Sequence, residues 1–251
     1  MRTILLTEAE ENHRLELMRE SLSSVLCATD TEVLDLSDRN YRKYRLEIPD
    51  PYYDFLMAEL KEKIAELIVI GYKYDFFSEN LRTAGLSEEN RELFLTAIIA
   101  ADLADDRRYA VRKITLGEEI SVDGLYHFRM QKLLAKWQEI LSALPEYLSE
   151  DLYRSFMLYL IEDFPEKPVY VVDGKVFDEH YNRRTNARLL GESTVDGTVR
   201  EILLCAGKEV HLLGKVSEKV EEFLREFYGR NVVFHPREKT DAVLGKNYEN
   251  F

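Results

Sequence analysis

The sequence contains little cysteine. Its 251 residues include only Cys27 and Cys205, which lie far apart and form no C-x-x-C pair. Isolated cysteines of this kind are typical of buried thiols in a reducing compartment, so we expect both side chains to be buried.

Long apolar runs are also missing. The longest runs, 67–70 and 94–101, are far shorter than the roughly 20 residues that a membrane-spanning helix needs. The opening segment MRTILLTEAEENHR has an apolar run too short for the core of a secretory signal. We therefore expect a cytoplasmic protein with no membrane association.

Positive charge is outnumbered. The chain has 34 Lys and Arg against 47 Asp and Glu, a formal net charge of -13. Nucleic-acid binders need a basic face that displaces counterions, so we predict no nucleic-acid partner. Basic clusters at 39–45 and 107–113 are the only support for that alternative.

The familiar phosphate and nucleophile motifs are absent too. Gly214-Lys215 follows a predicted strand, but Glu209 and Val216 stand where a phosphate-binding loop needs glycine and Ser or Thr. There is no G-x-G-x-x-G dinucleotide motif, and no serine or cysteine has a local nucleophile signature. We predict no cofactor and no metal, and the sequence leaves open whether the protein is an enzyme.

The first 48 residues predict a β-α-β unit. Thr3 to Leu6 and Val33 to Leu36 have the composition of short strands, and Thr7 with Glu10 has the spacing of a capping box before a helix. The polar, basic segment 37–50 predicts a linker or surface loop, since charge runs usually form solvated segments.

Residues 50–163 predict a helical region. Apolar residues recur at three or four positions over 52–77, over a helix capped by Ser87, and over 123–144. We expect the last of these to begin at Asp123 and to stop at Pro145, and Ser149 to cap another helix.

Residues 164–235 predict a hairpin followed by a second β-α-β unit. Asp173-Gly174 lies between two apolar runs, which is a strong hairpin signal, and 178–198 resembles a long connection. Residues 198–205 are compatible with a helix, capped by Thr198 and ended by Gly207, or with a strand. Residues 209–213, 217–228 and 231–235 predict strand, helix and strand, before a flexible tail at 236–251.

Together these elements predict an α/β or α+β fold. Terminal β-α-β units and the hairpin would build a small sheet beside a helical middle, and the two ends of the chain could share that sheet.

Two groups of residues could carry chemistry. His211 and His235 end or nearly end two predicted parallel strands, at the edge where open α/β sheets bind ligands. The alternative is two ordinary strand histidines. His180, Arg183 and Arg184 lie in the polar connection, where they could bind an acidic group or use His180 as a general base, or could simply be solvated. Asp123 and His127 lie one helical turn apart and could bind a metal or hold each other. The simpler interpretation is a capping aspartate beside a histidine that the helix dipole influences.

The segment 124–131 resembles the YtxC-like family of sporulation proteins. That family's pattern Gly-Phe-x-x-Phe-Arg-Leu-Lys is matched here by Gly124, Phe128 and Arg129, while Leu125, Met130 and Gln131 depart from it. Tyr153 to Met157 resembles the family's Tyr-x-x-Phe helix, and Val210-His211 its late strand. The resemblance implies a cytoplasmic role in endospore formation without an established activity, and it supplies no catalytic residue.

These observations favour a non-enzymatic interaction or regulatory protein with an unidentified protein partner, and a candidate homo-oligomer. The alternative is a small-ligand-binding protein or enzyme that uses His180, Arg183 and Arg184, or His211 and His235.

Overall fold

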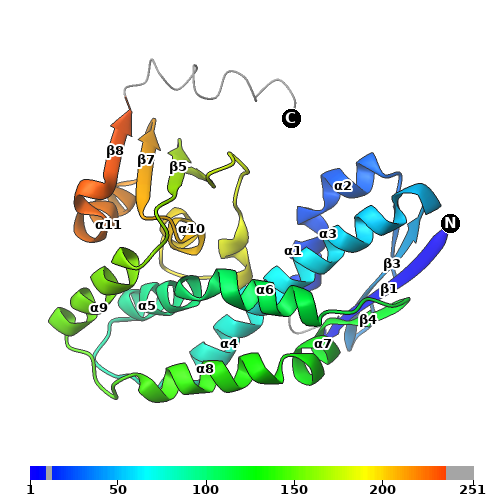
Figure 1. Ribbon diagram of the computed structural model, residues 1–251, viewed down its shortest axis with the longest axis horizontal. Helices are drawn as coiled ribbons and strands as arrows, with labels where there is room; N and C mark the ends of the chain where they lie inside the picture. The colour runs from blue at the N-terminus through cyan, green and yellow to red at the C-terminus, as the bar shows by residue number, and fades with distance from the viewer. Residues whose placement is uncertain (10–12, 236–251) are drawn as a thin grey trace. The chain divides into compact units, whose positions relative to one another are not determined.

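The computed structural model describes residues 1–9 and 13–235, and Figure 1 labels most of their helices and strands. The chain divides into two compact units. Unit 1 consists of Met1–Leu81 and Leu103–Leu144, and unit 2 of Arg82–Asp102 and Pro145–Phe251. The predicted helical region therefore contributes helices to both units.

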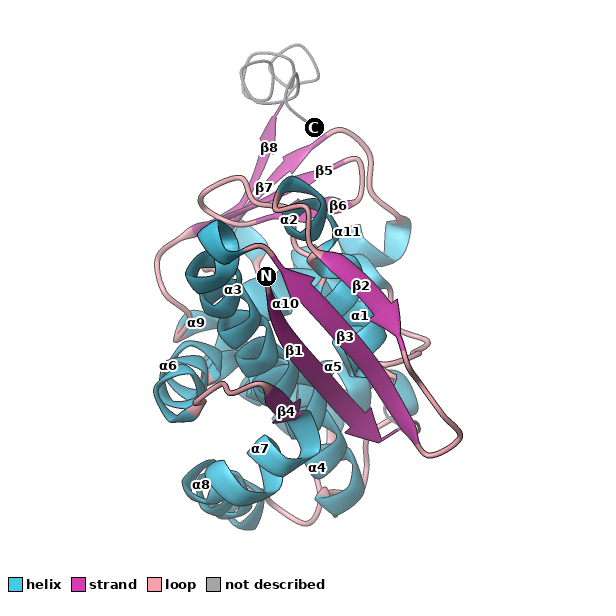
Figure 2. Ribbon diagram, turned by 90° about the vertical axis from the view of Figure 1, so that its right-hand side faces the viewer, coloured by secondary structure: helices cyan, strands magenta, loops and turns pink. Residues whose placement is uncertain are grey.

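Unit 1 contains a four-stranded mixed sheet in the order β2-β3-β1-β4. Its strands are β1 (Arg2–Ala9), β2 (Glu32–Asp35), β3 (Tyr41–Ile48) and β4 (Glu119–Ser121). β3 pairs antiparallel with β1 and β2, whereas β4 pairs parallel with β1. Figure 2 shows β2, β3 and β1 side by side. β1 and β2 therefore run parallel but do not pair, because β3 separates them.

The prediction of a linker at 37–50 was wrong, since this segment contains β3. Tyr44, Leu46 and Ile48 are buried, and the charged residues between them point to the other face. An antiparallel strand with one solvated face can carry many charges, so the charge run concealed a strand with period-two burial. The capping box was also wrong, because Thr7 lies within β1.

Seven α-helices of unit 1 lie within its described residues: α1 (Arg14–Ser21), α2 (Ser23–Ala28), α3 (Tyr53–Glu66), α4 (Lys73–Asn80), α6 (Leu103–Lys113), α7 (Val122–Arg129) and α8 (Gln131–Ala143). A fully buried π-helical segment, η3 (Leu67–Tyr72), joins α3 to α4. The helix predicted over 123–144 is interrupted at Met130, and Ser121 rather than Asp123 caps α7.

Unit 2 contains a second mixed sheet, in the order β6-β5-β7-β8. Its strands are β5 (Pro168–Val172), β6 (Lys175–Phe177), β7 (Glu209–Leu213) and β8 (Val232–His235). β5, β7 and β8 are parallel, and β6 is antiparallel to β5. The predicted hairpin is confirmed: Asp173 and Gly174 both have positive φ, at 47° and 78°.

In the described part of unit 2 the α-helices are α5 (Glu88–Ala101), α9 (Glu150–Glu162), α10 (Gly197–Cys205) and α11 (Glu218–Phe227). Ser87 and Ser149 cap α5 and α9 as predicted. The β7-α11-β8 unit is confirmed, and α10 makes a second crossover from the hairpin to β7. Asp196 caps α10, so the prediction of Thr198 as the cap was wrong, and Ala206 rather than Gly207 adopts the left-handed conformation at its end.

The predicted α/β class with a helical middle is confirmed. Strands from the two ends of the chain form two separate sheets rather than one. The prediction of buried thiols holds for Cys205 but was wrong for Cys27, which is exposed.

Candidate functional site

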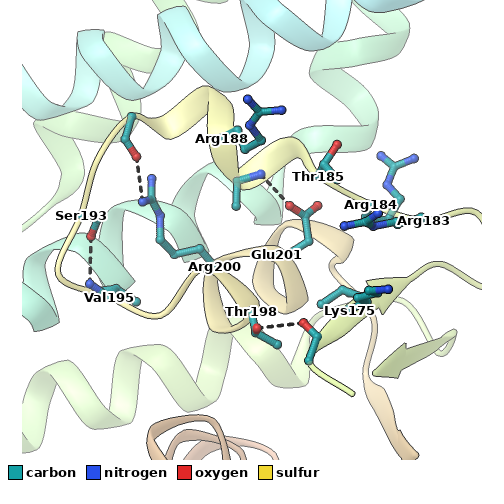
Figure 3. Close-up of a pocket in the computed structure, with 15 residues that line it drawn as sticks. Lys175, Arg183, Arg184, Thr185, Arg188, Ser193, Val195, Thr198, Arg200 and Glu201 are labelled. Atoms are coloured by element: carbon teal, nitrogen blue, oxygen red, sulfur yellow. Dashed lines mark hydrogen bonds between the residues drawn. The ribbon is translucent and has the colours of Figure 1, made fainter. Parts of the chain in front are cut away.

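Unit 2 holds a cavity of about 410 Å³ beside the N-terminal part of α10, which we call the basic pocket. Its walls come from the start of β6, from the connection after β6 and from the first turns of α10. Figure 3 shows the residues that line it: Gly174, Lys175, Val176, Arg183, Arg184, Thr185, Ala187, Arg188, Gly191, Ser193, Val195, Gly197, Thr198, Arg200 and Glu201.

Positive charge dominates this lining. Five cationic side chains surround the cavity, namely Lys175, Arg183, Arg184, Arg188 and Arg200. Glu201 is the one acidic side chain among the lining residues. The charge of this lining is therefore opposite in sign to the net charge of the whole chain, which is -13.

Two consecutive residues of α10 form the buried floor. Arg200 and Glu201 are each only 4% exposed. Arg200 Nη1 donates a hydrogen bond of 3.0 Å to the carbonyl of Gly191, and Glu201 Oε2 accepts one of 2.6 Å from the backbone N–H of Ala187. Both bonds tie the connection after β6 to α10, so the floor also positions the 3-10 turn η4 (Asn186–Leu190), which carries Arg188.

A turn centred on Asp178 positions the next two arginines. Its carboxylate accepts hydrogen bonds of 2.9 Å from the backbone N–H groups of His180 and Asn182. The same carboxylate lies 3.7 Å from the Arg184 guanidinium. The Arg184 N–H donates to the carbonyl of Val176 at 2.8 Å, so the connection folds back along β6 and places Arg183 and Arg184 at the cavity.

The N-terminal end of α10 carries its own carboxylate. Asp196 accepts hydrogen bonds of 2.8 Å from the Thr198 N–H and the Ser217 hydroxyl, and the Thr198 hydroxyl donates to the carbonyl of Gly174 at 3.0 Å. Because a negative charge already sits at this helix end, the cationic side chains rather than the helix dipole would hold an anion here.

The structure therefore brings together only part of the predicted site. Arg183 and Arg184 line the basic pocket, whereas His180 is exposed and does not line it. Sequence reasoning missed Lys175 and Arg200. The sequence did offer a signal for Arg200, because Arg200 and Glu201 form a charged pair inside the otherwise apolar segment 199–205. Charged side chains in such a segment become buried, and a buried charge needs a partner or a ligand.

The two predicted strand histidines do meet, away from that lining. His211 Nδ1 lies 2.7 Å from His235 Nε2, and the planes of the two rings are nearly parallel, 13° apart. The parallel register pairs His211 with Val233, which places His235 diagonally across from it. His211 Nε2 lies 3.1 Å from Glu209 Oε1, and the ring of Tyr170 packs against His211. Across residues 1–9 and 13–235, no group of three or more His, Cys, Asp or Glu could hold a metal ion.

Unit 1 contains charged groups of a different kind. Asp106 is 1% exposed and accepts hydrogen bonds from the Lys73 and Lys136 ammonium groups at 2.7 Å and from the Trp137 indole at 2.9 Å. Burial acts to raise the pKa of Asp106, but the two lysines and the indole stabilise the carboxylate and lower it.

A second buried cluster joins Glu8, Tyr72 and Asp123. The Tyr72 hydroxyl lies 2.7 Å from Asp123 Oδ1 and 3.3 Å from Glu8 Oε1, and Glu8 Oε2 accepts from the Leu15 N–H at 2.7 Å. Burial raises the pKa of Glu8 to about 7, outweighing the stabilisation of its charge by Leu15 and Arg14. Asp123 is thus bound to Tyr72 and to the Ala9 N–H rather than acting as a helix cap.

Comparisons with protein-family models, curated proteins and solved structures found no match to this chain. The resemblance to YtxC-like proteins therefore stays a prediction. No helix in the described part of the chain is both long and apolar enough to cross a membrane.

Proposed function

We propose that unit 2 binds a small anionic molecule in the basic pocket. The observation that carries this proposal is the gathering of five cationic side chains around one cavity of about 410 Å³ in an acidic protein. Guanidinium groups bind carboxylate and phosphate oxygens in a bidentate manner, and small-molecule sites commonly have volumes of roughly 300 to 1,000 Å³.

Binding is better supported than catalysis at this site. The one acidic residue of the lining, Glu201, uses Oε2 to hold the Ala187 N–H, and the predicted general base His180 is not part of the lining. The net charge of -13 favours a small anion over a nucleic acid, whose phosphate backbone would be repelled by the rest of the surface.

The test is a thermal-shift titration with sodium phosphate against sodium chloride of equal ionic strength. We expect phosphate to raise the melting temperature of the wild-type protein but not that of the Arg183→Ala/Arg188→Ala variant. Both arginines are exposed, so the variant should fold. Arg225→Ala, which removes an exposed charge from α11, is the matched control and should behave like wild type. Equal shifts with phosphate and chloride would refute the proposal.

A second candidate is a protein partner connected with endospore formation, as the sequence resemblance implies. The observation that favours it is an exposed apolar face on α9: Leu152 is 48% exposed, and Tyr159, two turns later, is 67% exposed. Affinity capture from sporulating cells under mild cross-linking tests it. We expect a stoichiometric partner that Tyr159→Glu abolishes, and recovery of the tagged chain alone would exclude this candidate.

A further inference from the structure

We propose that unit 1 binds an extended segment of a partner protein, which adds a strand to the outer edge of β4. The bound segment carries an apolar side chain and a carboxylate. This site is independent of the basic pocket, which belongs to unit 2. Three features of the described residues support it: a strand edge without a partner strand, a cavity beside that edge, and an arginine without an ion pair.

β4 ends the sheet of unit 1 and directs backbone groups away from it (Figure 2). It pairs parallel with β1, with Glu119 opposite Leu5, and the Leu5 N–H donates to the Glu118 carbonyl at 2.7 Å. Because alternate residues of a strand direct their backbone groups to opposite edges, the Glu119 N–H and C=O point away from β1. No other strand within residues 1–9 and 13–235 pairs with β4, so this edge can accept an added strand.

A cavity of about 380 Å³ lies beside this edge, and we call it the β4 groove. Its lining includes Glu119 and Ser121 from β4, and Leu125, Phe128 and Arg129 from α7. The three α7 residues are three or four positions apart, so the helix presents them on one side. Phe128 is 82% exposed, and an apolar side chain of the added strand would cover it. Backbone hydrogen bonds to the strand edge supply affinity in this mode of binding, and side-chain contacts supply specificity.

Charge at the groove selects the partner. Arg129 is exposed in the last turn of α7 and forms no ion pair with a described residue. A guanidinium group binds a carboxylate through two parallel hydrogen bonds, so the added strand places an Asp or Glu side chain there. A second copy of this chain that paired through β4 would bring another Glu118 and Glu119 to an edge that already holds them. Like charges on paired strands are destabilising, so a segment of different sequence fits better.

Selection of random heptapeptides displayed on phage, with the full-length protein as target, tests this proposal. We expect enriched sequences that contain an apolar residue and Asp or Glu. A synthetic, end-capped copy of a selected peptide should bind at least about tenfold more weakly to Phe128→Ala and to Arg129→Ala, in a fluorescence anisotropy titration. Both positions are exposed, so the variants should fold, and Lys132→Ala, an exposed cation outside the groove lining, is the matched control.

Two further probes test the backbone contacts. Glu119→Pro removes the outward N–H and leaves the bond between the Leu5 N–H and the Glu118 carbonyl in place, so it should weaken binding without changing the circular dichroism spectrum. N-methylation of alternate backbone nitrogens of the peptide should weaken binding as well, because an added strand needs those donors.

The outcomes that would overturn the proposal are distinct. No enriched sequence, or binding that Phe128→Ala and Arg129→Ala leave unchanged, would exclude the β4 groove as a peptide site. Equal binding of the N-methylated peptide would exclude an added strand, and a basic consensus would exclude the carboxylate. Self-association of the wild-type protein in light scattering, lost in Glu119→Pro, would make a second copy the occupant instead.

Discussion

The Asp106 cluster of unit 1 and the basic pocket of unit 2 both gather charged side chains, but they balance them differently. Asp106 is surrounded by Lys73, Lys136 and the Trp137 indole, and both Lys73 and Asp106 are shielded from solvent. In the basic pocket five cations face one lining carboxylate, and Arg183 and Arg188 are exposed. Charged groups that pair with one another stabilise the fold. A cavity lined by more cations than carboxylates can instead bind an anion from outside the protein.

The largest expected effect is on the stability of unit 1. Asp106→Ala leaves the Lys73 ammonium buried without its counter-ion, which typically costs about 3 to 5 kcal/mol. Urea unfolding followed by circular dichroism measures the loss. Lys73→Met/Asp106→Leu, which removes both charges, should recover most of it. Asp105→Ala, at an exposed position of the same helix, is the control, and an equal loss in both single variants would contradict a structural role for Asp106.

The second effect is a pH dependence that arises from Glu8. Its pKa rises from 4.5 to about 7 on folding, so the folded state keeps the proton while the unfolded state releases it. Stability should therefore fall as pH rises from about 4.5 to about 7, by about 3 kcal/mol at ~1.4 kcal/mol per pH unit, and then stay level. Glu8→Gln, which cannot titrate, should lack this fall.

Urea unfolding of wild type and Glu8→Gln between pH 4.5 and pH 8 measures the difference, with Glu20→Gln as an exposed control on α1. The difference between wild type and Glu8→Gln should change across this range. A constant difference would show that Glu8 does not hold its proton in the folded state.

A smaller effect is expected at the floor of the basic pocket. Arg200→Met removes the charged donor of a part-buried hydrogen bond to the Gly191 carbonyl, and a hydrogen bond to a charged group typically contributes about 1.5 to 3 kcal/mol. Unfolding should show this loss together with weaker phosphate binding. Arg225→Met, at an exposed position, should change neither property, and unaltered stability of Arg200→Met would contradict the role of this bond.

The smallest effect on stability is expected at the rim. Arg183→Ala/Arg188→Ala should change the free energy of unfolding by less than about 0.5 kcal/mol, as exposed substitutions usually do, while it abolishes the thermal shift with phosphate. A loss of several kcal/mol would mean that these arginines serve the fold, and the contrast between the two units would disappear.

Much of the fold followed from local patterns. Ser87 and Ser149 cap helices as predicted, because each cap depends on a hydrogen bond to a backbone N–H within a few residues. Asp173-Gly174 forms its turn for the same local reason. The largest error, the linker predicted at 37–50, arose because β3 forms by pairing with β1, which joins residues about forty positions apart.

The candidate site was predicted only in part. Arg183 and Arg184 stood out because they are adjacent in a polar segment. Lys175 and Arg200 lie apart from them in the sequence, on β6 and α10, and meet them only in the folded chain.

The sequence by itself determined the acidic balance, the helix caps at Ser87 and Ser149, the hairpin and the parallel β7-α11-β8 unit, since composition and short-range spacing suffice for these. Only the tertiary structure decided that the strands form two sheets and that Asp106 meets Lys73. It also decided that five scattered cations surround one cavity. Such meetings depend on contacts between segments far apart in the chain, and no local pattern specifies which of the many compatible pairings buries its charges and apolar surface best.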